Sequence, residues 1–80
     1  MEEGEYYIGE WKNDLRNGKG IEYYNSGDIY KGDFRNDKKE GKGIYYYNDG
    51  DRRMGDYLND KPIGKHVILT KNGEVKTKNY

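Results

Sequence analysis

The sequence repeats itself at a fixed step of 23 residues, from 7 to 30 to 53, and this repeat constrains the fold more than any other feature. Residues 7–11, 30–34 and 53–57 each have glycine in the middle, followed by an acidic residue and then an aromatic one. Self-similarity at a fixed period is the signature of architectures built from stacked copies of one small unit. The chain is therefore expected to fold as a series of equivalent units.

A second block in each repeat begins with glycine and has a branched aliphatic residue three positions later. This block occupies residues 18–24, 41–47 and 64–70. Because both blocks keep the same step, we assign a single repeat domain to residues 1–80, with repeats at approximately 5–27, 28–50 and 51–73.

Each half of the repeat predicts a β-strand, because it is rich in Tyr, Ile and Val and is bounded by Gly, Asn and Asp. Residues 13–17, 36–40 and 59–63 are expected to form the turns within the hairpins, with Pro62 in the last of them. The sequence thus predicts an all-β antiparallel meander of six strands. Residues 74–80 are either a seventh, capping strand or a frayed tail.

Alternation along the first strand places Tyr7, Gly9 and Trp11 on one face. For the return strand we favour placing Gly18 and Gly20 on that same face, because these glycines leave room for the Trp11 ring. An aromatic ring from a neighbouring strand is expected to cover the strand glycines. The opposite face would then carry Ile21, Ile44 and Val67.

Composition and charge narrow the classes of partner. The 15 basic and 15 acidic side chains give a formal net charge of zero, so no general attraction to nucleic acid is expected. The absence of cysteine fits a reducing compartment. Apolar runs are short, and the acidic start at residues 1–3 is unlike a signal peptide. We expect a cytoplasmic location, including the periphery of a membrane or cytoskeletal structure.

The residues that catalysis uses most often are scarce. The chain has one histidine and no cysteine, and a single-layer sheet offers no deep cleft. The glycines around Lys19 and Lys42 lack the following helix that a phosphate-binding loop requires. We predict no enzyme activity, cofactor, metal site or small-molecule substrate, and interpret His66 as a half-exposed strand residue in a position that glycine occupies in the other repeats.

Two sets of side chains are candidates for binding. Aromatic residues recur at repeat positions, and Tyr and Trp are favoured at protein interfaces. This aromatic set, which is either structural or partner-binding, comprises Tyr7, Trp11, Tyr24, Tyr30, Phe34, Tyr47 and Tyr57. Basic residues concentrate in the C-terminal part, where they could contact anionic lipid head groups. This basic set comprises Arg52, Arg53, Lys61, Lys65, Lys71, Lys76 and Lys78.

The first two repeats resemble the MORN repeat. The resemblance rests on residues 7–13 (YIGEWKN) with Gly18-Lys19-Gly20-Ile21, and on residues 30–36 (YKGDFRN) with the block at 41–47. It extends over residues 5–73, although the third copy has Arg53 and His66 where the other copies have tyrosine and glycine.

This resemblance implies an elongated, twisted, single-layer sheet of stacked hairpins. It also implies a scaffold that binds a protein partner or a second copy of itself, which we take as the main expectation. Binding to anionic phospholipid is the alternative expectation, and a passive spacer is a third.

Overall fold

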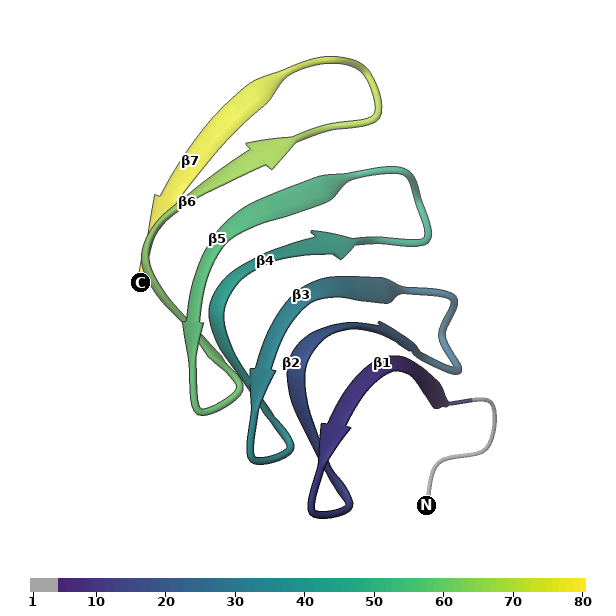
Figure 1. Ribbon diagram of the computed structural model, residues 1–80. Helices are drawn as coiled ribbons and strands as arrows, with labels where there is room; N and C mark the ends of the chain where they lie inside the picture. The colour runs from purple at the N-terminus through teal and green to yellow at the C-terminus, as the bar shows by residue number, and fades with distance from the viewer. Residues whose placement is uncertain (1–4) are drawn as a thin grey trace.

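The computed structural model describes residues 5–80 as one sheet of seven strands, in which every neighbouring pair is antiparallel and strand order follows chain order (Figure 1). The strands are β1 (Tyr6–Lys12), β2 (Leu15–Tyr23), β3 (Ile29–Arg35), β4 (Lys38–Tyr46), β5 (Arg52–Leu58), β6 (Lys61–Leu69) and β7 (Val75–Asn79). The predicted all-β meander is confirmed. Residues 75–79 pair with β6, so the tail forms the capping strand and not a frayed end.

The turns within the hairpins contain two residues each, which is shorter than the five predicted. Asn13 and Asp14 both have positive φ, 52° and 65°, and the same Asn-Asp pair closes the other two hairpins. Two consecutive residues with positive φ are the mark of the type I′ turn, whose twist matches the twist of the flanking strands. Residues 15–17 therefore belong to β2, and Pro62 lies inside β6, where we had placed a turn.

Each hairpin is bent along its length, so the sheet is strongly curved (Figure 1). The bend coincides with a register shift between Gly9 and Trp11 in the first hairpin, which recurs between Gly32 and Phe34 and between Met54 and Asp56. Extra residues on one strand of an antiparallel pair locally bend the sheet and increase its twist.

The register confirms the predicted assignment of the two faces. Gly9 pairs with Gly20, and Ile8 pairs with Ile21, so the glycine set lies on the same face as Tyr7. We call the side that carries Tyr7 and Gly20 the aromatic face, and the side that carries Ile8 and Ile21 the isoleucine face.

The described residues contain no helix long and apolar enough to cross a membrane. Within residues 5–80, no three His, Asp or Glu side chains are grouped so that they could hold a metal ion. The acidic start at residues 1–3, on which the signal-peptide argument depended, lies outside the described residues.

Candidate functional site

Seven rings form one continuous ladder along the aromatic face. The order is Trp11, Tyr7, Phe34, Tyr30, Tyr57, His66 and Tyr80. Neighbouring rings meet edge to face, with centroids 4.9 to 5.3 Å apart. Such pairs contribute about 0.5–1.5 kcal/mol each beyond the area they bury. The ladder therefore ties each hairpin to the next and supplies most of the core.

The tyrosine that leads each of the first two repeats lies over the glycines of its own hairpin. A Cβ on Gly43 would overlap the Tyr30 ring, and a Cβ on Gly20 would overlap Tyr7. The Tyr30 hydroxyl donates a hydrogen bond to the carbonyl oxygen of Asp33, at 3.2 Å. The prediction that an aromatic ring covers the glycines is confirmed.

The ring that covers Gly20 is, however, not the one we expected. We had placed Trp11 there, whereas Tyr7 occupies the space. The physical reason is reach, because tyrosine extends over the bend and its hydroxyl bonds to the carbonyl oxygen of Glu10 at 2.8 Å.

The third hairpin achieves the same packing with different residues. Arg53 stands where the other copies have tyrosine, and the ring over Gly55 is that of His66, from the facing strand. His66 is completely buried, so the interpretation as a half-exposed residue was wrong. The reason is that no tyrosine ring leads this repeat, and the His66 ring fills the space over Gly55 instead.

Two cations also lie on the aromatic face at equivalent positions. The guanidinium of Arg16 lies 5.1 Å from the centroid of the Phe34 ring and forms ion pairs with Glu22 and Asp37. The Lys39 ammonium lies 5.1 Å from the centroid of the Tyr30 ring. Burial lowers the pKa of Lys39, because desolvation disfavours its charged form. These cations cover rings and do not project outward for a ligand.

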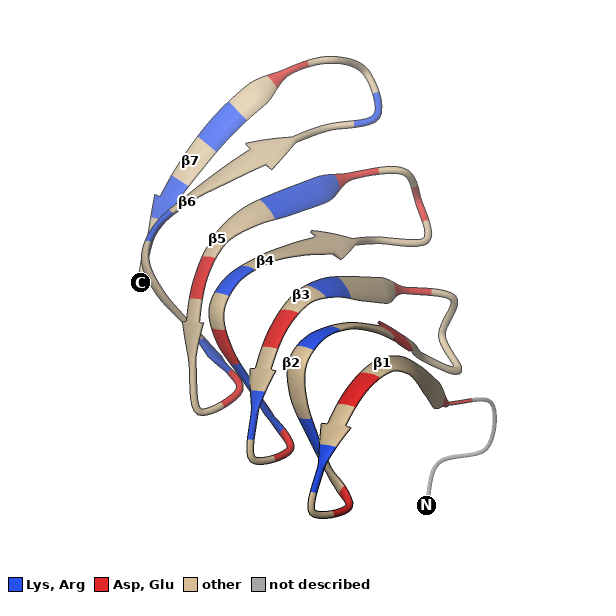
Figure 2. Ribbon diagram, viewed as in Figure 1, with Lys and Arg blue, Asp and Glu red and all other residues tan. Residues whose placement is uncertain are grey.

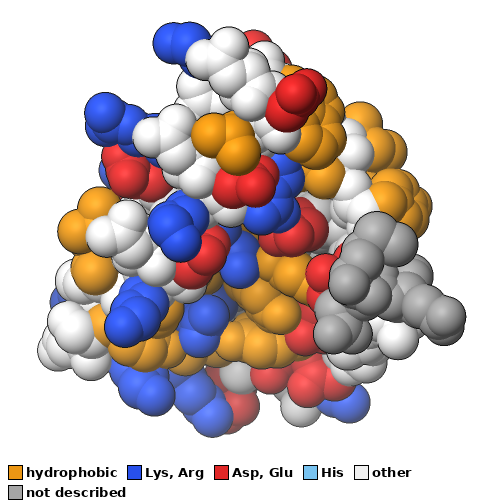
Figure 3. Space-filling view, turned by 90° about the horizontal axis from the view of Figure 1, so that it is seen from below, with side chains coloured by type: hydrophobic (Ala, Val, Ile, Leu, Met, Phe, Trp, Pro, Cys, Tyr) orange, Lys and Arg blue, Asp and Glu red, His pale blue; other side chains and the backbone are white. Residues whose placement is uncertain are grey.

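Three of the seven residues in the predicted aromatic set form the buried core. Tyr30, Phe34 and Tyr57 are at most 4% exposed, so no partner can contact them without unfolding the sheet. Tyr7, Tyr24 and Tyr47 are half-buried. Trp11, at the β1 end of the ladder, is 57% exposed. Seen from below, hydrophobic side chains collect in a hollow and charged side chains of both signs surround it (Figure 3).

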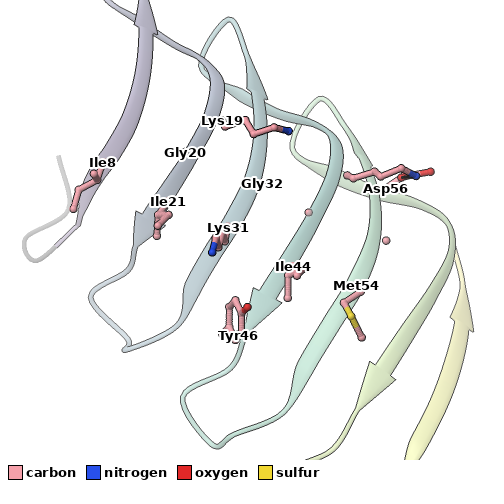
Figure 4. A pocket seen from close by; sticks show the side chains of 13 residues that line it. Ile8, Lys19, Gly20, Ile21, Lys31, Gly32, Ile44, Tyr46, Met54 and Asp56 are labelled. Atoms are coloured by element: carbon pink, nitrogen blue, oxygen red, sulfur yellow. Dashed lines mark ion pairs between the residues drawn. The ribbon is translucent and has the colours of Figure 1, made fainter.

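The isoleucine face carries an open groove of about 760 Å³ that crosses several strands. Its floor is a row of cross-strand neighbours, one from each successive strand, as Figure 4 shows. The row runs Ile8, Ile21, Lys31, Ile44 and Met54, and the register continues it to Val67. Ile8 is 56% exposed, so apolar surface remains open to solvent. Sequence reasoning placed the aliphatic residues on this face but gave no sign of a groove.

A second row runs beside the first, two residues further along each strand. It contains Tyr6, Tyr23, Ile29, Tyr46, Arg52 and Leu69. The Tyr6 and Tyr23 rings are stacked, with centroids 4.6 Å apart. We call the two rows together the apolar stripe, which comprises these six residues and the six of the first row.

The other side of the first row is a charged rim. Lys19 forms an ion pair with Asp33 at 2.8 Å, and Lys42 forms one with Asp56 at 3.7 Å. Basic and acidic side chains therefore alternate along one edge of the groove and partly neutralise one another's charge.

Two basic residues interrupt the apolar stripe itself. Lys31 lies between Ile21 and Ile44 in the first row, and Arg52 lies between Tyr46 and Leu69 in the second. Both are exposed, and neither forms an ion pair with an acidic residue in the described part of the chain. The stripe therefore carries positive charge with no acidic side chain among its members.

The predicted basic set does not form one surface. Arg53 lies on the aromatic face, where it donates a hydrogen bond to the Tyr80 hydroxyl at 2.9 Å. Lys76 and Lys78 pair with Ile68 and His66, and so belong to that same face. Arg52 and Lys65 belong to the isoleucine face, while Lys61 begins β6 and Lys71 follows it. Figure 2 likewise shows basic and acidic residues along every hairpin.

Comparison with protein-family models matches residues 7–29 and 30–52 to the MORN repeat. The two matches cover more than half of the 80 residues and coincide with the first two tyrosine-over-glycine hairpins. The third hairpin, which lies beyond the match, has the same strands, turn and ring ladder. A comparison with curated proteins found no match. The chain belongs to the MORN repeat family.

Proposed function

We propose that this chain is a non-catalytic protein-binding module whose binding surface is the isoleucine face. The MORN repeat is a non-catalytic repeat family, commonly found in binding or scaffold roles. The observation that carries the proposal is the difference between the two faces. The central rings of the aromatic face are at most 4% exposed because they pack on one another, whereas the isoleucine face leaves an apolar groove open across several strands.

The size of the sheet supports a protein ligand. Its extents are 40 × 26 × 17 Å, so one face offers an area on the order of 1,000 Å². A stable protein interface needs about 800 Å² from each partner. Small-molecule sites enclose most of their ligand, and this groove is open along its length.

The aromatic face, which the sequence favoured as the binding surface, has a different role in this proposal. Its rings hold the hairpins together, so their substitution would lower the stability of the fold before it altered any contact with a partner. Trp11 is the exception, because it ends the ladder and remains exposed.

The test is selection from an unconstrained random peptide library displayed on phage, panned against the immobilised protein. Selected peptides are then tested against Ile44→Asp, which puts a charge on the floor of the groove, and against Lys12→Asp, a charge change on an exposed residue at the end of β1. We expect binding to the first variant to fall at least tenfold and binding to the second to persist. Peptides that bind Ile44→Asp as well as the parent protein would show that the isoleucine face is not the site.

Two further measurements address other partners. Light scattering over a range of concentrations detects association of this chain with itself. Sedimentation with vesicles of phosphatidylcholine and phosphatidylserine detects lipid binding. Self-association or vesicle binding that Ile44→Asp abolishes, in the absence of any selected peptide, would assign the isoleucine face to that partner and overturn the proposal.

A further inference from the structure

We propose that the isoleucine face recognises an acidic amphipathic α-helix of a partner protein, laid across the strands with two carboxylates opposite Lys31 and Arg52. This inference rests on the proposed function, since it names the class of partner that the groove accepts. It is drawn from the charges within the apolar stripe and from the spacing of the strands that carry the stripe.

The charges decide the sign of the partner. Lys31 and Arg52 are the charged members of the apolar stripe, and both are positive. Each has apolar neighbours on the adjacent strands, so a ligand that covers the stripe removes both cations from water. A buried cation needs a carboxylate partner, because an unpaired charge under an interface is strongly unfavourable. The complementary ligand therefore carries acidic residues among apolar ones.

The spacing between neighbouring strands indicates the shape of the partner. Neighbouring strands in a sheet lie about 4.8 Å apart, and one turn of an α-helix rises about 5.4 Å. A helix perpendicular to the strands can therefore place one side chain over each strand. The small difference between the strand spacing and the rise of one turn is absorbed by flexible side chains. It is also about 10 Å across, wide enough to cover both rows of the stripe. Side chains on one face of an extended peptide recur about every 6.6 Å, which fits the row poorly.

The two cations also set the spacing of the acids. Lys31 is on β3 and Arg52 is on β5, so they lie two strands apart, or about 10 Å across the sheet, and they are offset by one row along the strands, which the reach of their long side chains can span. Two helical turns rise about 11 Å and span seven residues. The expected ligand has leucine-like residues at helical spacing and two Asp or Glu residues seven positions apart on the same face.

The same charges make other occupants of the groove less suitable. A second copy of this chain placed face to face would bring Lys31 and Arg52 into an interface with no acidic member of the stripe to meet them. An anionic membrane would lie over the rim as well, where the carboxylates of Asp33 and Asp56 already neutralise the basic side chains beside them and leave no net positive charge to attract it. Its flat surface would also leave the groove unfilled.

The experiment is a display library built on a stable helical scaffold, with one face randomised over about five turns. It is panned separately on the parent protein and on the variant Lys31→Glu/Arg52→Glu, both positions being exposed. From the parent we expect helices with Asp or Glu at two positions seven residues apart. From the double variant we expect Lys or Arg at those positions, with at least tenfold discrimination between the two proteins in each case. A third variant, Lys31→Gln/Arg52→Gln, should bind both sets weakly.

Other outcomes separate this inference from the proposed function. Selected helices without acidic enrichment, or helices that bind the parent and the charge-reversed variant equally, overturn the inference. If unconstrained peptides still depend on Ile44, the proposed function survives that result. A library that yields no helix from the parent protein overturns the inference as well, as does vesicle binding that the charge reversal abolishes while no helix is selected.

Discussion

The Nε2 atom of His66 lies 2.9 Å from the carbonyl oxygen of Asp56, at the position that the Tyr30 hydroxyl takes on Asp33 in the second hairpin. A carbonyl oxygen only accepts, so the ring nitrogen donates and the imidazole carries hydrogen on Nε2. The histidine thus replaces the tyrosine both as a ring over glycine and as a hydrogen-bond donor. In the third repeat, arginine replaces the leading tyrosine at position 53, and histidine at position 66 compensates for the lost ring.

Restoring the pattern of the other repeats should therefore require both substitutions together. His66→Gly alone leaves a cavity over Gly55 and should lower the free energy of unfolding by about 2–4 kcal/mol. Arg53→Tyr alone adds a ring where His66 already lies and should cost about 1–3 kcal/mol through overpacking. The double variant should return to within about 1 kcal/mol of the parent, since the new tyrosine fills the space. Urea unfolding of the four proteins measures the coupling between the two sites.

The matched control is Arg53→Leu with His66→Gly, which removes the imidazole without supplying a ring. This control should remain as unstable as His66→Gly alone. If the tyrosine and leucine double variants unfold at the same urea concentration, the two positions are independent and the interpretation of a compensated change is wrong.

Much of this architecture could be predicted from the sequence, because the step of 23 residues and the alternation of side chains are both local patterns. They placed Gly20 and Ile21 on their correct faces. What could not be predicted depends on the bend. The His66 ring is buried over Gly55 where the strand pair bends, and nothing in the order of the residues shows that bend. The groove also depends on how far the strands curve, so only the aliphatic residues of that face could be predicted.

The glycines under the tyrosine rings should be intolerant of any side chain. Gly43→Ala would drive a methyl group into the Tyr30 ring, which is completely buried and cannot move aside. We expect a loss of about 2–4 kcal/mol in the free energy of unfolding, because the added methyl group overpacks a region whose side chains cannot move aside. Gly64→Ala is the control, because open space surrounds a Cβ at that position. Its cost should be limited to the left-handed backbone conformation, about 1–2 kcal/mol, and equal losses in the two variants would contradict the argument.

Asp37 connects two hairpins and should make the fold sensitive to acid. Its carboxylate accepts hydrogen bonds from the backbone N–H and the Nε of Arg16, at 3.0 and 2.9 Å. These bonds lower the pKa of Asp37 in the folded state. Because the folded value lies below the unfolded one, the stabilisation is present above about pH 4 and is lost as the pH falls through the folded value. Asp37→Asn should cost about 0.5–1.5 kcal/mol at neutral pH.

The difference in the free energy of unfolding between the parent protein and Asp37→Asn should shrink as the pH falls below the unfolded pKa and through the lowered folded pKa of Asp37, where the parent carboxylate becomes protonated. Urea midpoints at neutral and acidic pH measure this difference. Asp14 occupies the equivalent turn position in the first hairpin and accepts no hydrogen bond from a described residue, so Asp14→Asn serves as the control. A constant difference in urea midpoint between the parent protein and Asp37→Asn across the pH range would show that the carboxylate charge does not contribute to stability.

Tyrosine burial should set the alkaline limit of stability. Burial raises the pKa of Tyr24, Tyr30 and Tyr45, and acceptor carboxylates of Glu22 and Asp28 raise the pKa of Tyr24 and Tyr45 further. Since each folded pKa lies above the unfolded value of 10.0, the folded state holds these protons more tightly. The stabilisation is complete below about pH 10 and declines as the pH rises beyond it.

We therefore expect the ultraviolet absorbance of tyrosinate to appear partly in a cooperative step, at the pH where circular dichroism reports loss of the sheet. In urea the same groups should titrate without such a step. Tyr45→Phe removes one of these groups and should reduce the height of the cooperative step, whereas Tyr6→Phe removes an exposed hydroxyl and should leave the unfolding pH unchanged. Smooth titration of all the tyrosines while the sheet signal persists would mean that the buried hydroxyls do not resist ionisation, and that the core is looser than the ring ladder indicates.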